Sequence, residues 1–185
     1  MEKNLRQTPS DCIRVALFGP ESTGKTTLAK ALATHYKTEW VPEFAREYLQ
    51  QKWDTKKKIC AQEDIFPIAL GQMELENKYV LKANKLLFCD TTLLTTEVFS
   101  RVYFDNWCDK RIIEANKENH YSIYLLTNID VPWVADDLRD KPNERHEMFL
   151  SFQKALETRK IKYVLLKGTH DTRMNTAIEY INSFL

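Results

Sequence analysis

The sequence predicts an α/β domain with a largely parallel central sheet of five strands. Short apolar runs alternate with longer segments whose apolar residues recur at helical spacing. Strands buried on both faces read as continuous apolar runs, and their alternation with helices is typical of a parallel sheet. The chain has 185 residues, of which 43% are hydrophobic, so we expect a single domain with a sizeable core.

The first half of the chain contains two strands and the helices that follow them. The run Ile13–Phe18 predicts a buried strand, and the apolar spacing of 25–36 predicts a helix. Trp40-Val41 ends a second strand, and the proline after it favours the start of a helix. A long helix is expected over about 62–83, with Pro67 as a candidate for its true beginning.

The second half repeats the alternation. Leu86–Cys89 predicts the next buried strand, and apolar residues at helical spacing continue from Leu94 to Tyr103. The remaining expected elements are a helix over about 107–118, a strand at 122–126, a charged stretch at 130–147, a helix to about 159, a strand at 163–166 and a final helix over 171–184.

Composition restricts the class of protein. Lys and Arg number 27 and Asp and Glu 26, and a net charge of +1 does not favour nucleic-acid binding through a basic field. No apolar run approaches the roughly 18 residues of a membrane span. The polar first twelve residues lack the core of a signal peptide. We therefore expect a cytoplasmic domain over 13–185, without membrane insertion, after a flexible tail over 1–12.

The four cysteines do not form a metal motif. Cys12, Cys60, Cys89 and Cys108 include no CxxC pair, and no histidine stands at zinc-ligand spacing from them. We expect reduced thiols in a cytosolic protein.

The motif that carries chemistry is Gly19-Pro20-Glu21-Ser22-Thr23-Gly24-Lys25-Thr26, which matches the GxxxxGK[ST] pattern of a P-loop. The chain has only four glycines, and two of them lie in this loop, which indicates an unusual backbone. Backbone N–H groups and the helix N-terminus converge on phosphates, Lys25 reaches the β- and γ-phosphates, and Thr26 binds Mg²⁺. The residues expected to bind ATP are Gly19, Glu21, Ser22, Thr23, Gly24, Lys25, Thr26, Thr27 and Gly168.

Asp90 ends the strand expected beside the P-loop strand and is the second candidate ligand for Mg²⁺. Its alternative role is to cap the next helix, given the threonines that follow it. Thr91 stands where hydrolytic P-loop ATPases commonly carry a glutamate, which disfavours an ATP-driven motor. The nearest match to the guanine-reading NKxD motif, at 116–119, ends in Asn. Kinase chemistry, with an organic hydroxyl as the attacking group, remains.

Two further regions are candidates for the acceptor site and a lid. Glu43 and Arg46 follow the second strand, and ligands collect at the carboxyl ends of parallel strands. Glu43 is expected to accept the acceptor's proton or bind sugar hydroxyls, although it also suits a helix N-terminus. The stretch 130–147 is expected to form a mobile lid carrying Arg139 and Arg145, the alternative being a solvated helix face. Gly168 either lines the adenine pocket or forms the turn before the last helix.

Four blocks together resemble a known family. They are GPESTGKTTL at 19–28, VPEFAREYL at 41–49, DTTLLTT at 90–96 and DVPWVADDLRD at 130–140. They resemble the ribosylnicotinamide kinase domain of NadR-type proteins, with similarity from about 13 to 183. The P-loop block is generic, whereas the other three are much more specific.

The resemblance implies a P-loop kinase fold, a three-layer sandwich, that uses ATP and Mg²⁺. It implies phosphorylation of nicotinamide riboside at its 5′-hydroxyl to give nicotinamide mononucleotide. By the same resemblance Lys25, Thr26 and Asp90 serve ATP and metal, Arg139 and Arg145 belong to the lid, and Glu43 and Trp133 lie on the riboside side.

The chemistry of the riboside supports further candidates. Its pyridinium is cationic, so aromatic faces and carboxylates suit it, and Tyr48, Asp130 and Trp133 supply them beside Glu43. Trp107 is expected to pack in the core instead. Either Asp90 or Glu43 accepts the hydroxyl proton, and Asp90 is favoured because it should lie nearer the γ-phosphate.

Two rival functions remain open. One is a kinase for another nucleoside or nucleotide, and a nucleotide acceptor would need additional cations such as Arg46. The other is a P-loop ATPase or nucleotide sensor. NadR proteins often carry a nucleotidyltransferase domain before the kinase, and adenylyl transfer is not expected of these residues.

Overall fold

Five parallel strands form one sheet in the order β2–β3–β1–β4–β5, which confirms the expected α/β fold. The computed structural model describes residues 5–136, 138 and 142–185. The strands are β1 (Ile13–Phe18), β2 (Glu39–Val41), β3 (Leu86–Cys89), β4 (Ile123–Thr127) and β5 (Val164–Leu166).

The helices fall close to the expected positions. Those described are α1 (Lys25–Tyr36), α2 (Phe44–Lys56), α3 (Gln62–Val80), α4 (Leu93–Tyr103), α5 (Lys110–Glu118), α6 (Arg145–Thr158) and α7 (His170–Asn182), with a 3₁₀ turn at Pro142–Glu144. Pro67 lies inside α3 and does not mark its beginning. The helix begins earlier because Asp64 accepts a hydrogen bond from the Ala61 backbone N–H at 2.7 Å and caps it.

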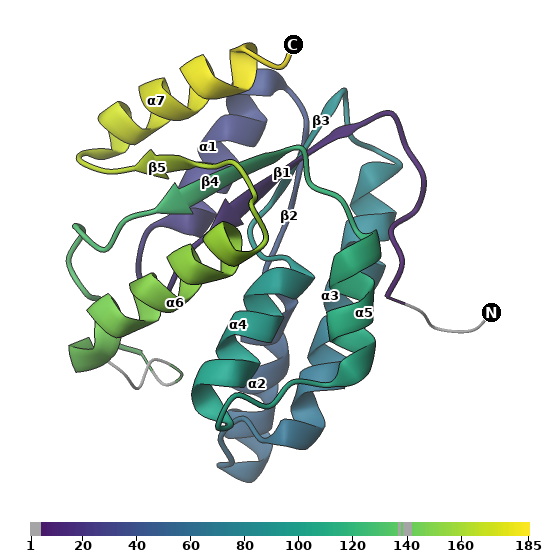
Figure 1. Cartoon of the computed structure of the whole chain (residues 1–185), viewed down its shortest axis with the longest axis vertical. Helices are drawn as coiled ribbons and strands as arrows, with labels where there is room; N and C mark the ends of the chain where they lie inside the picture. The colour runs from purple at the N-terminus through teal and green to yellow at the C-terminus, as the bar shows by residue number, and fades with distance from the viewer. Residues whose placement is uncertain (1–4, 137, 139–141) are drawn as a thin grey trace.

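The domain has three layers, because alternate side chains of β1 point to opposite faces of the sheet. Val15 and Leu17 pack against α1 and α7 on one face, whereas Ala16 and Phe18 pack against α4 and α6 on the other. Figure 1 shows α1 and α7 together on one side of the sheet and α6 and α4 on the other. A smaller apolar cluster joins α3, α4 and α5.

The segment before β1 lies against this smaller cluster, in contrast to the tail expected from its composition. Leu5 is buried beside residues of α3 and α5. The Gln7 side-chain amide donates to Glu76 at 2.7 Å, and the Thr8 N–H donates to Asn77 at 2.7 Å. In Figure 1 this segment runs beside α3 and α5 before it enters the sheet.

The strand order places the site. The chain leaves β1, forms β2 and β3 on one side of it, and returns to form β4 on the other side. Ligands bind at such a switch point, outside the carboxyl ends of the strands. Within the described residues, no helix combines the length and the apolar character that crossing a bilayer requires.

Candidate functional site

The loop between β1 and α1 has the backbone that phosphate binding requires. Gly19 has a φ of 143°, and a Cβ there would meet the carbonyl oxygen of Thr127 at 2.9 Å. Gly24 has a φ of 82° and is the N-cap residue of α1. A side chain at Gly19 would therefore push the loop away from β4, and both glycines support the expected P-loop conformation.

Lys25 and Thr26 emerge from this loop toward the end of β3. The buried Lys25 donates from Nζ to the Pro20 carbonyl at 2.6 Å. The Thr26 hydroxyl donates to Asp90 Oδ2 at 2.5 Å, and the Asp90 N–H donates to the Val41 carbonyl at 3.0 Å. The structure therefore brings together the lysine, hydroxyl and carboxylate that the sequence proposed for phosphate and metal.

Asp90 is the electrostatic centre of the site. Its carboxyl is 1% exposed, and burial raises its pKa to about 7 although the nearby Lys25 charge lowers it. The negative charge of Glu43 raises the pKa of Asp90 further. Among the described residues, Asp90 Oδ1 has no hydrogen-bond partner.

These groups fit a magnesium ion. Mg²⁺ is commonly held by one or two protein oxygens together with substrate phosphates and water. The orphaned Asp90 Oδ1 and the Thr26 hydroxyl are such oxygens. No group of three or more metal-ligating side chains occurs in the described part of the chain, so no all-protein cage is formed there.

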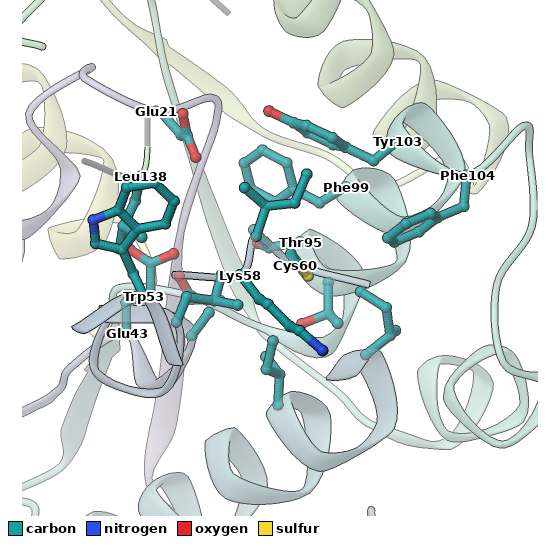
Figure 2. Close-up of a pocket in the computed structure, with 17 residues that line it drawn as sticks. Glu21, Glu43, Trp53, Lys58, Cys60, Thr95, Phe99, Tyr103, Phe104 and Leu138 are labelled. Carbon is teal, nitrogen blue, oxygen red and sulfur yellow. The ribbon is translucent and has the colours of Figure 1, made fainter. Parts of the chain in front are cut away.

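An apolar cleft opens beside the P-loop (Figure 2). Two carboxylates, Glu21 and Glu43, line it, and Lys58 is the only cation among the described residues that do. Figure 2 shows aromatic and apolar side chains on both sides of the cleft, namely Trp53, Phe99, Tyr103, Phe104 and Leu138. The cleft therefore suits a flat organic ring without a phosphate.

The sequence analysis did not assign these aromatic residues to the site. Phe99 and Tyr103 have the spacing of residues on the buried face of a helix. Both pack against the core, but they also line the cleft. Trp53 lies on α2, ten residues beyond Glu43, and no local pattern separates a cleft-lining tryptophan from an ordinary surface one.

Glu43 is held at the mouth of the cleft by α3. It is the N-cap residue of α2. The buried Gln72 of α3 accepts from the Phe44 N–H at 2.8 Å and donates to the Pro42 carbonyl at 3.2 Å. These two bonds fix the backbone on both sides of Glu43.

Three of the expected substrate-binding residues have other partners. Arg46 forms an ion pair with Asp136 at 2.5 Å, and the Tyr48 hydroxyl donates to Asp64 at 3.1 Å; neither residue lines the cleft. Asp130 accepts from the Gly168 N–H at 2.6 Å and pairs with Arg173. Its carboxylate is therefore committed to protein groups, because a buried guanidinium needs a counter-ion.

Arg145 connects the segment after β4 to the P-loop. Its guanidinium donates to the Ser22 carbonyl at 3.2 Å, and it lies 5.6 Å from the Trp133 ring. Burial lowers the pKa of Arg145, and its Nε has no hydrogen-bond partner among the described residues. The Val134 N–H also donates to the Ser22 hydroxyl, at 2.9 Å. The other expected lid arginine, Arg139, lies outside the described residues.

The loop after β5 forms the turn that precedes α7. Gly168 has a φ of 88°, and Thr169 caps α7 by accepting from the Thr172 N–H at 3.2 Å. Arg173, which the sequence analysis overlooked, is buried behind this loop. The available signal was its position four residues before Ala177 and eight before Ile181, on the inner face of the helix.

Comparison with known proteins shows the family and the fold of the chain. The family model described as AAA domain (AAA_28) matches residues 14–173. Over 92% of the chain, the sequence is 29% identical to the trifunctional NAD biosynthesis/regulator protein NadR of Escherichia coli K12 and 28% identical to that of Salmonella typhimurium. The chain spans 42% of the length of each of these relatives.

Solved structures share the fold. A NadR protein in complex with NR superposes with a TM-score of 0.79 at 23% identity, covering 93% of this chain and 51% of that one. Deoxyadenosine kinase from M. mycoides superposes with a TM-score of 0.67 at 14% identity, covering 92% of this chain and 100% of that one. Thymidylate kinase from Candida albicans superposes with a TM-score of 0.66 at 17% identity, covering 95% of this chain and 93% of that one. The expected similarity to NadR and the expected P-loop kinase fold are confirmed.

Proposed function

The chain belongs to the AAA_28 family of AAA domains, and from this premise we propose that it is an ATP-dependent kinase for nicotinamide riboside. The product is nicotinamide mononucleotide, formed by transfer of the γ-phosphoryl group to the 5′-hydroxyl. The similarity to NadR proteins over 92% of the chain supports this reaction. The proposal concerns only this kinase step, because the chain spans less than half of those relatives.

The composition of the cleft is the observation that carries the proposal. Aromatic walls and two carboxylates, Glu21 and Glu43, suit a cationic pyridinium ring. A nucleoside monophosphate would need cations for its phosphate, and of the described lining residues only Lys58 is cationic. Arg46, the other candidate for that role, is paired with Asp136.

The proposed mechanism relies on position and charge. The P-loop N–H groups and Lys25 bind the phosphates, and Thr26 and Asp90 would hold Mg²⁺, which would neutralise phosphate charge when bound. Asp90 accepts the proton of the 5′-hydroxyl, because it is the carboxylate that lies beside Thr26 of the P-loop, where the phosphates bind. Glu43 is the alternative base, and Arg145 lies where it can stabilise charge on the transferring group.

A hydrolytic ATPase is the less favoured reading. Thr91 follows Asp90, and its hydroxyl donates to the Asp90 carbonyl at 2.7 Å, so it does not offer a carboxylate to activate water. We propose a cytoplasmic location, which the four free cysteines support.

The test is an acceptor panel. The purified protein is incubated with MgATP and nicotinamide riboside, deoxyadenosine, thymidine or thymidylate, and products are identified by mass spectrometry. We expect one added phosphate on nicotinamide riboside alone. Phosphate on a different acceptor overturns the substrate, and ADP without a phosphorylated acceptor overturns the kinase.

A matched pair of variants tests the charge of the cleft. Glu43→Gln should lower kcat/KM for nicotinamide riboside by about tenfold or more, as loss of a charged partner at a desolvated site does. Glu47→Gln, an exposed position on the same helix, is the control and should leave kcat/KM unchanged.

A further inference from the structure

Arg173 makes four polar contacts that the proposed mechanism does not explain. Its side chain is almost fully buried, with 4% of the residue exposed. Nε donates to the Gly168 carbonyl at 3.1 Å, Nη1 to the Thr23 carbonyl at 2.7 Å and Nη2 to the Asn128 carbonyl at 3.1 Å. Nη2 also pairs with the Asp130 carboxylate.

These partners belong to three separate segments. Thr23 is in the P-loop after β1, Asn128 and Asp130 follow β4, and Gly168 follows β5. All three segments leave the carboxyl ends of adjacent strands, the edge where a nucleotide binds to such a sheet. One guanidinium therefore joins the phosphate loop to the loop after β5.

Three of the contacts of Arg173 are to backbone carbonyls, and two of these carbonyls lie at or next to a glycine with a positive φ. Gly168 has a φ of 88°, and Asp130 accepts from its N–H at 2.6 Å while pairing with Arg173. Thr23 directly precedes Gly24, whose φ is 82°. The Thr23 hydroxyl also shares a hydrogen bond of 2.7 Å with Thr127 at the end of β4.

We propose that Arg173 is a positioning residue for the nucleotide. It sets the P-loop at Thr23 relative to the loop at Gly168 and, through Asp130, holds the shape of that second loop. In this role Arg173 does not touch the reacting atoms. Asp130 then serves the nucleotide side of the site through Arg173, and does not bind the riboside. The inference rests on the proposed function only in requiring that the P-loop binds ATP.

The test compares two buried arginines. Arg14 is as well buried as Arg173 and binds a carboxylate and a carbonyl, those of Glu76 and Thr8, but it lies at the start of β1, away from the P-loop. Arg173→Met and Arg14→Met each remove a buried guanidinium, so both should lower the melting temperature. Only Arg173→Met should weaken binding of magnesium AMP-PNP, measured by calorimetry without an acceptor.

We expect the dissociation constant for magnesium AMP-PNP to rise about tenfold or more in Arg173→Met, since small misplacements at such sites are costly. Arg173→Lys should show a similar loss, because one ammonium cannot span the partners of a guanidinium. The KM for the acceptor should change by less than about twofold, because most residues that line that cleft lie on α2, α3 and α4 or in the loop between α2 and α3.

Several outcomes overturn the inference. The inference is wrong if folded Arg173→Lys binds the nucleotide as tightly as the wild type. It is also wrong if Arg14→Met loses as much nucleotide affinity as Arg173→Met. If neither Arg173 variant folds, Asp130→Asn replaces them. It keeps an oxygen for the Gly168 N–H but removes the charge beside Arg173, and unchanged nucleotide affinity in that variant also overturns the inference. Wild-type protein that does not bind the nucleotide overturns the proposed function instead.

Discussion

At the scale of single residues, the P-loop lysine is held in place by the protein itself. Lys25 is buried, and its ammonium donates to the Pro20 carbonyl of the same loop at 2.6 Å. Its neighbour Thr26 is similarly fixed by the hydrogen bond to Asp90. Groups positioned by the fold in this way stabilise developing charge without reorganising during the reaction.

Lys25→Ala should therefore reduce turnover much more than substrate binding. Loss of one preorganised donor at such a site lowers kcat by about 10²–10³, whereas the KM for the acceptor should change little. Steady-state kinetics with a folded variant test this. Lys110→Ala, at an exposed position in the first turn of α5, is the control. Normal turnover in Lys25→Ala contradicts the site assignment.

At the scale of secondary-structure elements, α3 positions the backbone around Glu43, on the proposed acceptor side of the site. Gln72 pairs with the backbone of Pro42 and Phe44, and Gly71 leaves room for the Phe44 ring, with which a Cβ at that position would collide. The first turn of α2, and with it Glu43, is therefore located by a helix that contributes other residues to the cleft wall.

Gln72→Met tests this arrangement. The substitution keeps the volume of the side chain but leaves the Phe44 N–H and the Pro42 carbonyl without this partner. Both groups are partly buried, so the loss costs about 1 kcal/mol per group. We expect the KM for the acceptor to rise more than the KM for ATP. Gln62→Met, at the exposed first position of the same helix, should change neither constant. Equal changes in the two constants for Gln72→Met argue against a local role.

A second helix, α4, depends on a buried carboxylate. Glu97 accepts from Arg101 at 3.0 Å, from Arg159 at 2.7 Å and from Asn116 at 2.8 Å, and thereby joins α4 to α5 and to the end of α6. Burial opposes its ionisation, but the hydrogen bond from Asn116 and the charge of Arg159 outweigh burial and hold the pKa of Glu97 below its ordinary value.

The pH dependence of stability follows from this shift. A lowered pKa stabilises the fold above the ordinary glutamate value, and the contribution is lost as the pH falls through the lowered pKa. Glu97→Gln should cost about 1–2 kcal/mol at pH 7, because it weakens charge-assisted hydrogen bonds to Arg101 and Arg159, whose side chains are about a third exposed and partly screened by water. The deficit should shrink at pH values below about 4.3, the ordinary pKa of glutamate. Denaturant unfolding at several pH values measures it, and a deficit independent of pH contradicts the assignment.

At the scale of the whole molecule, the segment from Leu5 to Thr8 closes the end of the domain opposite the site. Leu5 covers the α3–α5 cluster, and Gln7 donates to Glu76, which also accepts from Tyr121 at 2.5 Å. Burial raises the pKa of Glu76, although the hydrogen bonds from Tyr121 and Gln7 oppose that rise. The buried carboxyl therefore depends on this segment for part of its hydrogen bonding.

Removal of residues 1–8 should lower the melting temperature by roughly 5 °C, the expected effect of exposing a buried leucine and its partners in a domain of this size. The KM values should not change, because the segment lies away from the carboxyl ends of the strands. Removal of the exposed Phe184 and Leu185 is the control and should have a smaller effect. Differential scanning calorimetry measures both, and an unchanged melting temperature after removal of 1–8 contradicts the docking role.

Local sequence patterns were sufficient to predict most strands and helices of this protein. The apolar runs, the helical spacing and the P-loop all depend on neighbours within a few residues, and the strands and helices of the structure agree closely with them. Asp90 was also predicted from a local pattern, because it directly follows an apolar strand, and the structure pairs that strand, β3, with β1. The end of the second strand, together with the resemblance to NadR proteins, predicted the acceptor region around Glu43, and this stays a prediction.

Pairings between distant segments could not be read from the sequence. Arg173 meets Thr23 across 150 positions and Asp130 across 43, and the cleft joins aromatic residues of α2 and α4. The stabilisation of a buried guanidinium depends on which carboxylate and carbonyls the fold brings within hydrogen-bonding distance. Composition and residue spacing do not predict these partners. For this reason Asp130 was expected at the substrate, whereas the tertiary structure commits it to Arg173.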